Sequence, residues 1–242
     1  MHEKSALIFA QWAAPDEASA EGVRFVRDGA TLPLSLQHFN VVLENGTEAR
    51  ASELLEHGAA RVMLADAALL DSTAVSRLAQ QYGSERIGIS LLAKKRYVSW
   101  TLDTVSNEDF NCVTPSYGKA GWEIVMSDGS ATGTDVEWWL DEMLALGASM
   151  ALICADIQDD DLNICAGLME AHSNKLWFSP WQQSDADLEP WVRYGQIRQL
   201  LLPMPNTRDE NEMARIRTAA MTEQEIAATE MVKAAGGEAA TV

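Results

Sequence analysis

Residues 121–161 constrain the fold of this chain more than any other stretch. In unbroken succession they predict a hairpin, a turn, an amphipathic helix, a Gly-Ala stop and a buried strand. From residue 40 onward, short apolar or β-branched runs alternate with polar segments of helical periodicity. This alternation is typical of βα units on a parallel sheet, and its regularity favours a closed (β/α)8 barrel of the TIM type over an open sheet.

Six βα units are predicted after residue 39. Several of their helices end at a glycine, where a left-handed residue is wanted, namely Gly58, Gly83, Gly147 and Gly195. The predicted strands are residues 40–43, 61–65, 86–92, 150–155, 175–180 and 199–203, and the predicted helices include residues 48–57, 72–82, 161–172, 185–194 and a long one from about residue 208.

Two parts of the chain depart from this regularity. Residues 6–9 and 23–26 predict strands without a convincing helix between them, so the N-terminal part is expected to be shortened or irregular. After the fifth strand, residues 97–102 and 122–126 predict a hairpin excursion, joined by the long polar loop 103–120. A loop of that length is uncommon without a function or disorder.

Composition bounds the class of protein. A chain of 242 residues that is 47% apolar is long enough for one large core, so a single domain over residues 1–242 is predicted. Its parts are an irregular N-terminal part (1–39), βα repeats (40–205), a C-terminal helix (206–232) and a loose tail (233–242). The net charge of -18 disfavours nucleic acid and anionic membrane surfaces as partners. Three cysteines without CxxC spacing and no signal-peptide pattern indicate a soluble cytoplasmic protein.

Short motifs then point to a family. They are Gly121-Trp122, Thr132-Gly133, Leu146-Gly147-Ala148 and Ala155-Asp156-Ile157, each weak alone but ordered and spaced together. This order resembles the second half of the histidine-biosynthesis barrels, the phosphoribosyl-formimino isomerase and the cyclase subunit of imidazole-glycerol-phosphate synthase. Residues 53–89 resemble the same family from its third helix to its fifth strand, and the resemblance covers roughly residues 40–205.

The resemblance implies acid–base chemistry by two aspartates, at the ends of the first and fifth strands. Here the first strand ends at Gln11 or Trp12, and the fifth at Leu92 or Ala93. None of these side chains can relay a proton near neutral pH, so the isomerase or cyclase reaction is expected to be lost. The chain is thus predicted to be a degenerate member of the family, a pseudoenzyme candidate.

The resemblance also implies two phosphate sites built from glycine-rich turns and small hydroxyl residues. Glu44-Asn45-Gly46 stands in place of the first turn, and Asp66 in place of a threonine. Later, Ser179-Pro180-Trp181 and Leu202-Pro203-Met204-Pro205 replace glycine-containing turns. Carboxylates repel phosphate and proline lacks an N–H group, so a bisphosphorylated substrate is disfavoured.

Other strand-end residues are candidates for a replacement site, because barrel enzymes carry their sites at the C-terminal ends of the strands. Asp66 and Asp156 are the candidate acid and base. The candidate ligand-pocket residues are Gln11, Glu44, Lys94, Arg96, Asp160 and Trp181. For Asp159 to Asp161, capping of the following helix is the alternative, and for the Lys94–Arg96 run it is a solvated turn.

Metal and cofactor chemistry find no support in the sequence. His2, His38, His57 and His172 lack metal-ligand spacing, and Cys154 and Cys165 are interpreted as apolar filler. Trp138 and Trp139 diverge by about 100° on one helix, so one of them is expected at the surface or at an oligomer interface.

Three functions stay open. The first is a binding, regulatory or scaffolding subunit without the family's reaction. The second is an enzyme with relocated acid and base, Asp66 and Asp156, acting on a small metabolite with little phosphate. The third is a divergent isomerase or cyclase of histidine biosynthesis.

Overall fold

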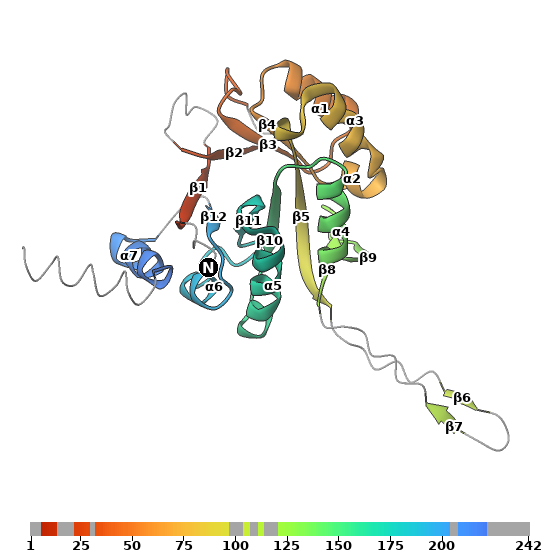
Figure 1. Ribbon diagram of the computed structural model, residues 1–242, viewed down its shortest axis with the longest axis vertical. Helices are drawn as coiled ribbons and strands as arrows, with labels where there is room; N and C mark the ends of the chain where they lie inside the picture. The colour runs from red at the N-terminus through yellow and green to blue at the C-terminus, as the bar shows by residue number, and fades with distance from the viewer. Residues whose placement is uncertain are drawn as a thin grey trace, which may run out of the picture.

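Eight parallel strands close into a barrel in the computed structural model, which describes residues 6–13, 22–29, 32–96, 104–106, 111–113, 121–203 and 208–221. The circle is closed by pairing of β1 with β12 and of β5 with β10 (Figure 1). The predicted (β/α)8 barrel is confirmed. In order around the barrel, the strands are β1 (Ile8–Trp12), β2 (Arg24–Arg27), β3 (Phe39–Leu43), β4 (Arg61–Leu64), β5 (Ile87–Arg96), β10 (Ala151–Ala155), β11 (Leu176–Ser179) and β12 (Gln199–Leu202).

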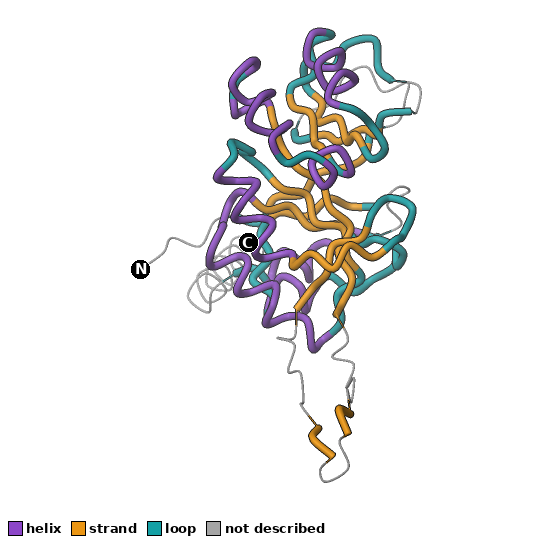
Figure 2. The backbone as a smooth tube through the Cα atoms, turned by 90° about the vertical axis from the view of Figure 1, so that its right-hand side faces the viewer, coloured by secondary structure: helices purple, strands orange, loops and turns teal. Residues whose placement is uncertain are grey.

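Helices follow most of the strands and lie on the outside of the barrel (Figures 1 and 2). Their apolar faces pack on the outward side chains of the strands in one large buried cluster. None of them, within the described residues, combines the length and the apolar character needed to cross a membrane. The helices are α1 (Glu48–Glu56), α2 (Asp66–Leu70), α3 (Thr73–Tyr82), α4 (Val136–Ala145), α5 (Leu162–His172), α6 (Glu189–Arg193) and α7 (Glu210–Ala219), with short 3-10 turns at Ser84–Arg86, Asp159–Asp161 and Ser173–Lys175.

A second buried cluster fills the barrel interior, because alternate side chains of each strand point inward. Gly88 on β5 makes room for this filling, since a Cβ there would lie 2.3 Å from the sulfur of Met63. At the N-terminal end of the barrel, Arg61 donates to the Asn40 side chain and to the Glu85 carbonyl, at 2.9 Å each. The interior cluster consists of Ala10, Phe25, Val42, Met63, Leu152, Cys154, Trp177 and Leu201.

The N-terminal strands β1 and β2 complete the barrel. In the described residues between β1 and β3, no helix is formed, as the sequence predicted. The first strand was expected at residues 6–9, but β1 runs from Ile8 to Trp12, because its partner β12 sets its register from Ile8↔Gln199 to Gln11↔Leu202. This shift of the strand places Trp12, and not a loop residue, at the barrel mouth.

The excursion after the fifth strand differs from the prediction. β5 continues past the barrel to Arg96, and its last part, from Leu92, pairs antiparallel with β8 (Gly121–Val125). β8 then pairs with β9 (Ala131–Asp135). The predicted partner, residues 97–102, lies outside the described residues, as does most of the loop. Within the loop, β6 (Thr104–Ser106) pairs with β7 (Asn111–Val113) in a separate two-stranded sheet.

Two helix predictions need correction. The helix expected at residues 185–194 is the short α6, with Pro190 in its first turn, where the missing N–H is harmless. The chain after Leu64 forms the extra helix α2 before α3, and Asp66 is its first residue. The C-terminal helix is described as α7, and residues 222–242 lie outside the described part.

Of the four glycines that were predicted to end a helix, three have the left-handed backbone conformation that this role requires. Gly58, Gly83 and Gly147 have φ of 89°, 94° and 111°, the region that favours glycine. At Gly195 the prediction is wrong, because Gln196 carries the positive φ, 56°. Gly195 serves close packing instead, since a Cβ there would lie 2.6 Å from the Trp191 carbonyl oxygen.

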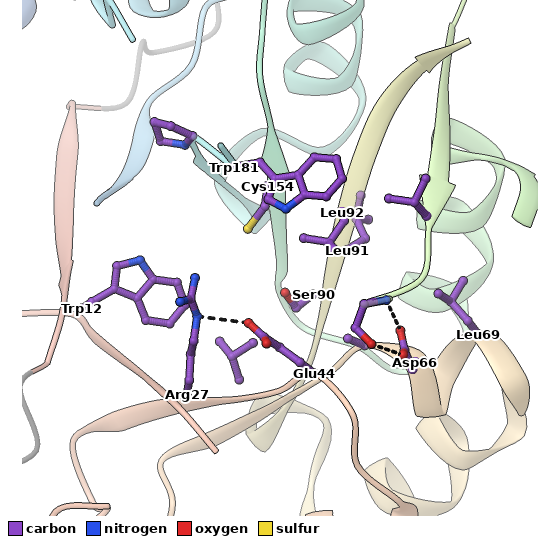
Figure 3. A pocket seen from close by; sticks show the side chains of 15 residues that line it. Trp12, Arg27, Glu44, Asp66, Leu69, Ser90, Leu91, Leu92, Cys154 and Trp181 are labelled. Carbon is purple, nitrogen blue, oxygen red and sulfur yellow. Dashed lines mark hydrogen bonds and ion pairs between the residues drawn. The ribbon is translucent and has the colours of Figure 1, made fainter. Parts of the chain in front are cut away.

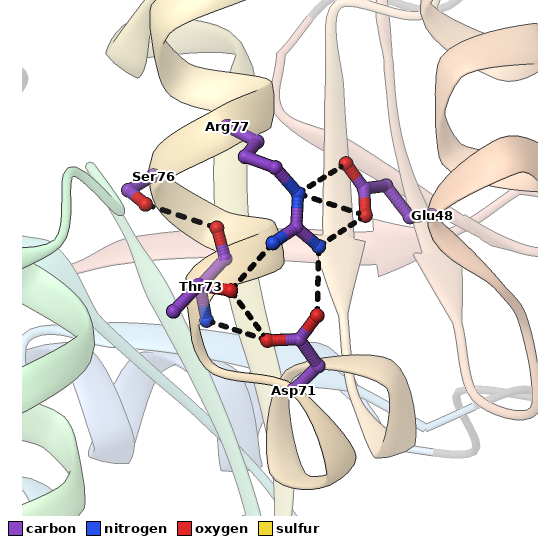
Figure 4. A network of polar contacts seen from close by, with 5 residues as sticks. All are labelled: Glu48, Asp71, Thr73, Ser76 and Arg77. Carbon is purple, nitrogen blue, oxygen red and sulfur yellow. Dashed lines mark hydrogen bonds and ion pairs between the residues drawn. The ribbon is translucent and has the colours of Figure 1, made fainter.

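Charged side chains join the helices on the α1 and α3 side of the barrel. Arg77 on α3 contacts Glu48 at the start of α1, Asp71 in the α2–α3 turn and the Thr73 hydroxyl (Figure 4). The Arg77 hydrogen bond holds the pKa of Glu48 below its usual value. All of these groups are at least partly exposed, so water and salt weaken the contribution of the network to stability.

The ion pair between Arg50 and Asp28 is expected to make the folded protein less stable in acid. Arg50 donates to both oxygens of Asp28, at 2.8 and 3.0 Å, and this hydrogen bonding lowers the pKa of Asp28. Because the folded-state pKa is lowered, the stabilisation is present above the unfolded value near 4 and is lost as the pH falls through the folded value. Asp28→Asn is expected to lower the free energy of unfolding by about 1 kcal/mol at pH 7, as for partly exposed pairs, and by less at pH 3. Thermal unfolding of both proteins at the two pH values measures this, and an equal difference at both would contradict it.

Candidate functional site

A cavity of about 250 Å³ opens at the C-terminal end of the barrel. It is the end at which barrel enzymes carry their sites. Figure 3 shows side chains from β1, β2, β5 and β10, among them Trp12, Arg27 and Cys154, around this cavity. The lining residues are Trp12, Arg27, Val42, Glu44, Ala65, Asp66, Leu69, Ser90, Leu91, Leu92, Val125, Ser127, Cys154, Pro180 and Trp181.

Trp12, at the end of β1, and Leu92, where β5 reaches the barrel mouth, line the cavity. Each belongs to one of the two pairs, Gln11 or Trp12 and Leu92 or Ala93, at which the family resemblance implies a catalytic aspartate. Their strand neighbours are placed differently: Gln11 is exposed and accepts a 3.3 Å hydrogen bond from Arg24, and Ala93 is buried against the helices. Gln11, a predicted pocket residue, therefore does not line the cavity. Neither strand end directs a proton-relaying side chain into it.

One side of the cavity holds a cation that is already paired. The Arg27 guanidinium lies over the Trp12 ring, 4.5 Å from its centroid, and forms a 3.0 Å ion pair with Glu44 (Figure 3). Stacking on an indole and pairing with a carboxylate are both favourable for a planar guanidinium. The structure thus places Glu44 in the cavity as predicted and gives it a partner that the sequence reasoning missed.

Asp66 forms another part of the cavity wall, next to Glu44, whose carbonyl oxygen accepts a 3.3 Å hydrogen bond from the Asp66 backbone N–H. Its carboxylate is 9% exposed and accepts a 3.1 Å hydrogen bond from the backbone N–H of Ser127 and another from the Ser127 hydroxyl. Ser127 lies in the β8–β9 turn, and its hydroxyl also contacts Asn45. The β5–β8 extension therefore supplies a wall of the cavity and holds Asp66 in place.

Asp156 binds the loop that follows β11. One oxygen of its carboxylate accepts backbone hydrogen bonds from Trp181, Gln182 and Gln183, at 3.2, 2.8 and 3.0 Å. Asp156 thereby fixes the loop after β11, and it is not among the residues that line the cavity. Its pairing with Asp66 as acid and base stays a prediction without a supporting contact.

The basic run Lys94–Arg96 lies beyond the cavity, on the extension of β5. Lys94 is exposed, and Arg96 is 3.9 Å from Asp135. Lys95 contacts Asp160, which raises the pKa of Lys95, and lies 3.4 Å from Asp161. Lys94, Arg96 and Asp160 were predicted as pocket residues, but none of them lines the cavity: β5 carries Lys94 and Arg96 past the barrel mouth, and Asp160 lies in the 3-10 turn after β10.

The three consecutive aspartates after β10 divide into two roles. Asp161 is 2% exposed and accepts from the Trp122 indole at 3.2 Å and from the Gln158 backbone N–H at 3.1 Å. This hydrogen bonding at the start of a helix agrees with the capping alternative. Asp159 is exposed at a neighbouring hollow, away from the barrel interior.

Cys154 and Cys165 are poor nucleophiles in this fold. Cys154 lines the cavity, but burial raises the pKa of its thiol to about 12, so the thiolate is scarce near neutral pH. Burial also raises the pKa of Cys165, which packs inside α5 against the core. Among the described residues, no three His, Cys, Asp or Glu side chains are grouped so that they could hold a metal ion.

The three tryptophans singled out from the sequence lie in different environments. Trp181 lines the cavity, as predicted. On α4, Trp138 is 58% exposed and Trp139 is 4% exposed, which confirms that the two diverge. Trp139 packs in the core and cannot contact a partner, so only Trp138 remains for the predicted oligomer interface, and that contact stays a prediction.

Comparison with known proteins agrees with the barrel and its motifs. Residues 41–163, just over half of the chain, match the family described as "Histidine biosynthesis protein". The chain belongs to this family. It is also 29% identical over 151 residues to the imidazole glycerol phosphate synthase subunit HisF of Prochlorococcus marinus. That match covers 61% of the chain and 49% of the relative, so the chain spans about half the length of this relative.

Sequence reasoning missed three polar groups of the cavity. Arg27 could have been found, because alternate residues of a strand share a face and Arg27 lies two residues after the interior Phe25 on β2. Ser90 could have been found in the same way, since it lies two residues before Leu92 on β5. Ser127 could not, because it meets Asp66 through the β5–β8 pairing, 61 residues along the chain.

Proposed function

We propose that this family member has lost the isomerase and cyclase reactions and acts as a ligand-binding or regulatory subunit. The observation that carries the proposal is the pair Trp12 and Leu92, which line the cavity where the first and fifth strands reach the barrel mouth and where the resemblance implies an acid and a base. An indole and an isobutyl group cannot exchange protons with a substrate near neutral pH. The cavity itself is retained.

The phosphate-binding requirements of the family's reaction are also unmet in this cavity. Asp66 occupies the first position of α2, where a carboxylate repels a phosphate, and α2 is only five residues long. After β11, Pro180 lines the cavity and offers no N–H group. These features support a ligand without phosphate, because a phosphate dianion would meet the carboxylates of Asp66 and Glu44, while Arg27 is already paired with Glu44.

Complementation tests this proposal directly. The full chain, expressed in bacterial histidine auxotrophs that lack either the isomerase or the cyclase subunit, is expected to give no growth without histidine. A plasmid carrying the missing enzyme is the positive control, and soluble expression of the chain is verified by immunoblot. Growth of either auxotroph would overturn the loss of the reaction. Native mass spectrometry of the purified protein then asks whether a small molecule is retained.

A further inference from the structure

We propose that Asp66 anchors a subsite for a small planar organic cation, such as an amidinium or a protonated aminoheterocycle, with Trp181 as its stacking wall. The proposal rests on the proposed function in one respect, that the cavity binds a ligand. It adds the charge and shape of that ligand. It also reverses the charge preference of the family's reaction, whose substrate carries phosphates.

The first observation is a buried carboxylate without a cation. Asp66 is 9% exposed, and its described partners are the N–H and the hydroxyl of Ser127. Within the described part of the chain, no Lys, Arg or His forms an ion pair with it. A carboxylate removed from water loses hydration that two neutral donors replace only in part, so a cation placed against it gains more than it would in solvent.

The second observation is that the same cavity already binds a planar cation from within the chain. Arg27 is stacked on Trp12 and paired with Glu44, and these three groups satisfy each other. Asp66 and Trp181 present the same two kinds of group in the same cavity, a carboxylate and an indole. Two carboxylates and one guanidinium line the cavity, so it carries an excess negative charge that favours a cation and disfavours an anion.

The third observation concerns size and shape. The cavity of about 250 Å³ lies below the usual range for drug-sized ligands, so it fits one ring with a small substituent. Besides its polar groups, the cavity lining includes the apolar side chains of Leu69, Leu92 and Val125. A flat ring can pack on these walls and on the indole, while its charged group reaches Asp66. Cation–π attraction adds to the charge pairing when the cation is shielded from water.

Three isosteric probes test the charge preference on the full chain. Benzamidine, benzamide and benzoate share one ring and differ in charge, and isothermal titration calorimetry at low salt measures their binding. We expect benzamidine to bind at least about tenfold more tightly than benzamide, and benzoate not to bind measurably, because one charge-assisted contact corresponds to about that factor. Equal or tighter binding of benzoate, or no binding of benzamidine at millimolar concentration, would overturn the subsite.

Single-residue variants then test whether Asp66 and Trp181 bind the probes. Asp66→Asn keeps the size of the side chain and is expected to reduce the preference for benzamidine over benzamide to within about twofold. Trp181→Leu is expected to weaken both ring probes. Asp159→Asn and Trp138→Leu are the matched controls, since both residues are exposed outside the cavity, and their binding is expected to be unchanged. Retention of the preference in Asp66→Asn, with the fold verified by circular dichroism, would remove Asp66 from the subsite.

The two proposals fail separately. Growth of an auxotroph in the complementation test would reject the loss of the family's reaction, whatever the probes show. Failure of benzamidine to bind would reject the cation subsite, while the absence of acid and base at the strand ends would be unaffected. The charge series uses the unmodified chain, so it decides the matter even if a variant does not fold.

Discussion

Replacing Trp177 with alanine is expected to lower the free energy of unfolding by about 3–5 kcal/mol, the usual cost of truncating a large buried aromatic side chain. Trp177 is 2% exposed inside the barrel and packs edge to face on Phe25, with ring centroids 5.6 Å apart. Because the interior is filled from strands that are fixed by their neighbours, the surrounding side chains cannot collapse fully into the space. Urea unfolding followed by circular dichroism measures the change.

Two further variants separate the effect of the lost side-chain volume from the effect of the indole N–H group. Among the described residues the Trp177 indole N–H has no hydrogen-bond partner, so Trp177→Phe removes an unpaired donor and keeps most of the apolar surface. We expect it to cost less than about 1.5 kcal/mol. Trp138→Ala, at an exposed tryptophan, is expected to change stability by no more than about 0.5 kcal/mol. A Trp177→Ala cost as small as that of Trp138→Ala would contradict the placement of Trp177 in the interior.

The regular part of the fold could be predicted from the sequence because each βα unit carries its own signals. Strand β3 and helix α1 were predicted within one residue at each end, since apolar periodicity and the capping Thr47 are local features. The position of β1 could not be predicted in the same way. Its limits are set by pairing with β12, almost the whole length of the barrel away in sequence. The pairing of β8 was also not predicted, because its partner is the end of β5, which is distant in the sequence.

For the site, the direction of a side chain matters more than its place at a strand end. Glu44, Asp66 and Trp181 were predicted and do line the cavity. Gln11 was predicted but is displaced by its neighbour Trp12, since a shift of one residue along a strand reverses the face. Lys94 and Arg96 were predicted at the mouth because β5 was expected to end at residue 92, but it runs to Arg96.

Asp156 illustrates how a residue type at a strand end can serve the scaffold. A carboxylate after β10 is compatible with acid–base catalysis, and sequence alone does not show which groups approach it. The structure brings three consecutive N–H groups of the β11–α6 loop to one of its oxygens. The loop carries Trp181, so Asp156 positions a wall of the cavity without lining it.

Asp156→Ala is therefore expected to lower the free energy of unfolding by about 2–3 kcal/mol, because three backbone donors lose a charged acceptor. The β11–α6 loop should also become more sensitive to limited proteolysis, and benzamidine should bind more weakly because Trp181 is no longer held in place. Asp187→Ala is the matched control. Asp187 lies in the same loop and accepts a single 3.1 Å hydrogen bond from the Glu189 backbone N–H, so its loss should cost about 1 kcal/mol or less.

Asp156→Asn distinguishes this anchoring role from catalysis. An amide oxygen can still accept the three hydrogen bonds but without the charge, so stability is expected to fall between wild type and Asp156→Ala. If Asp156 were instead the acid or base of a relocated reaction, Asp156→Asn would keep the fold and the proteolysis pattern and abolish turnover of a metabolite found by screening. Asp156→Ala with the stability and loop protection of Asp187→Ala would contradict the anchoring role, because the three N–H groups would then not depend on this carboxylate.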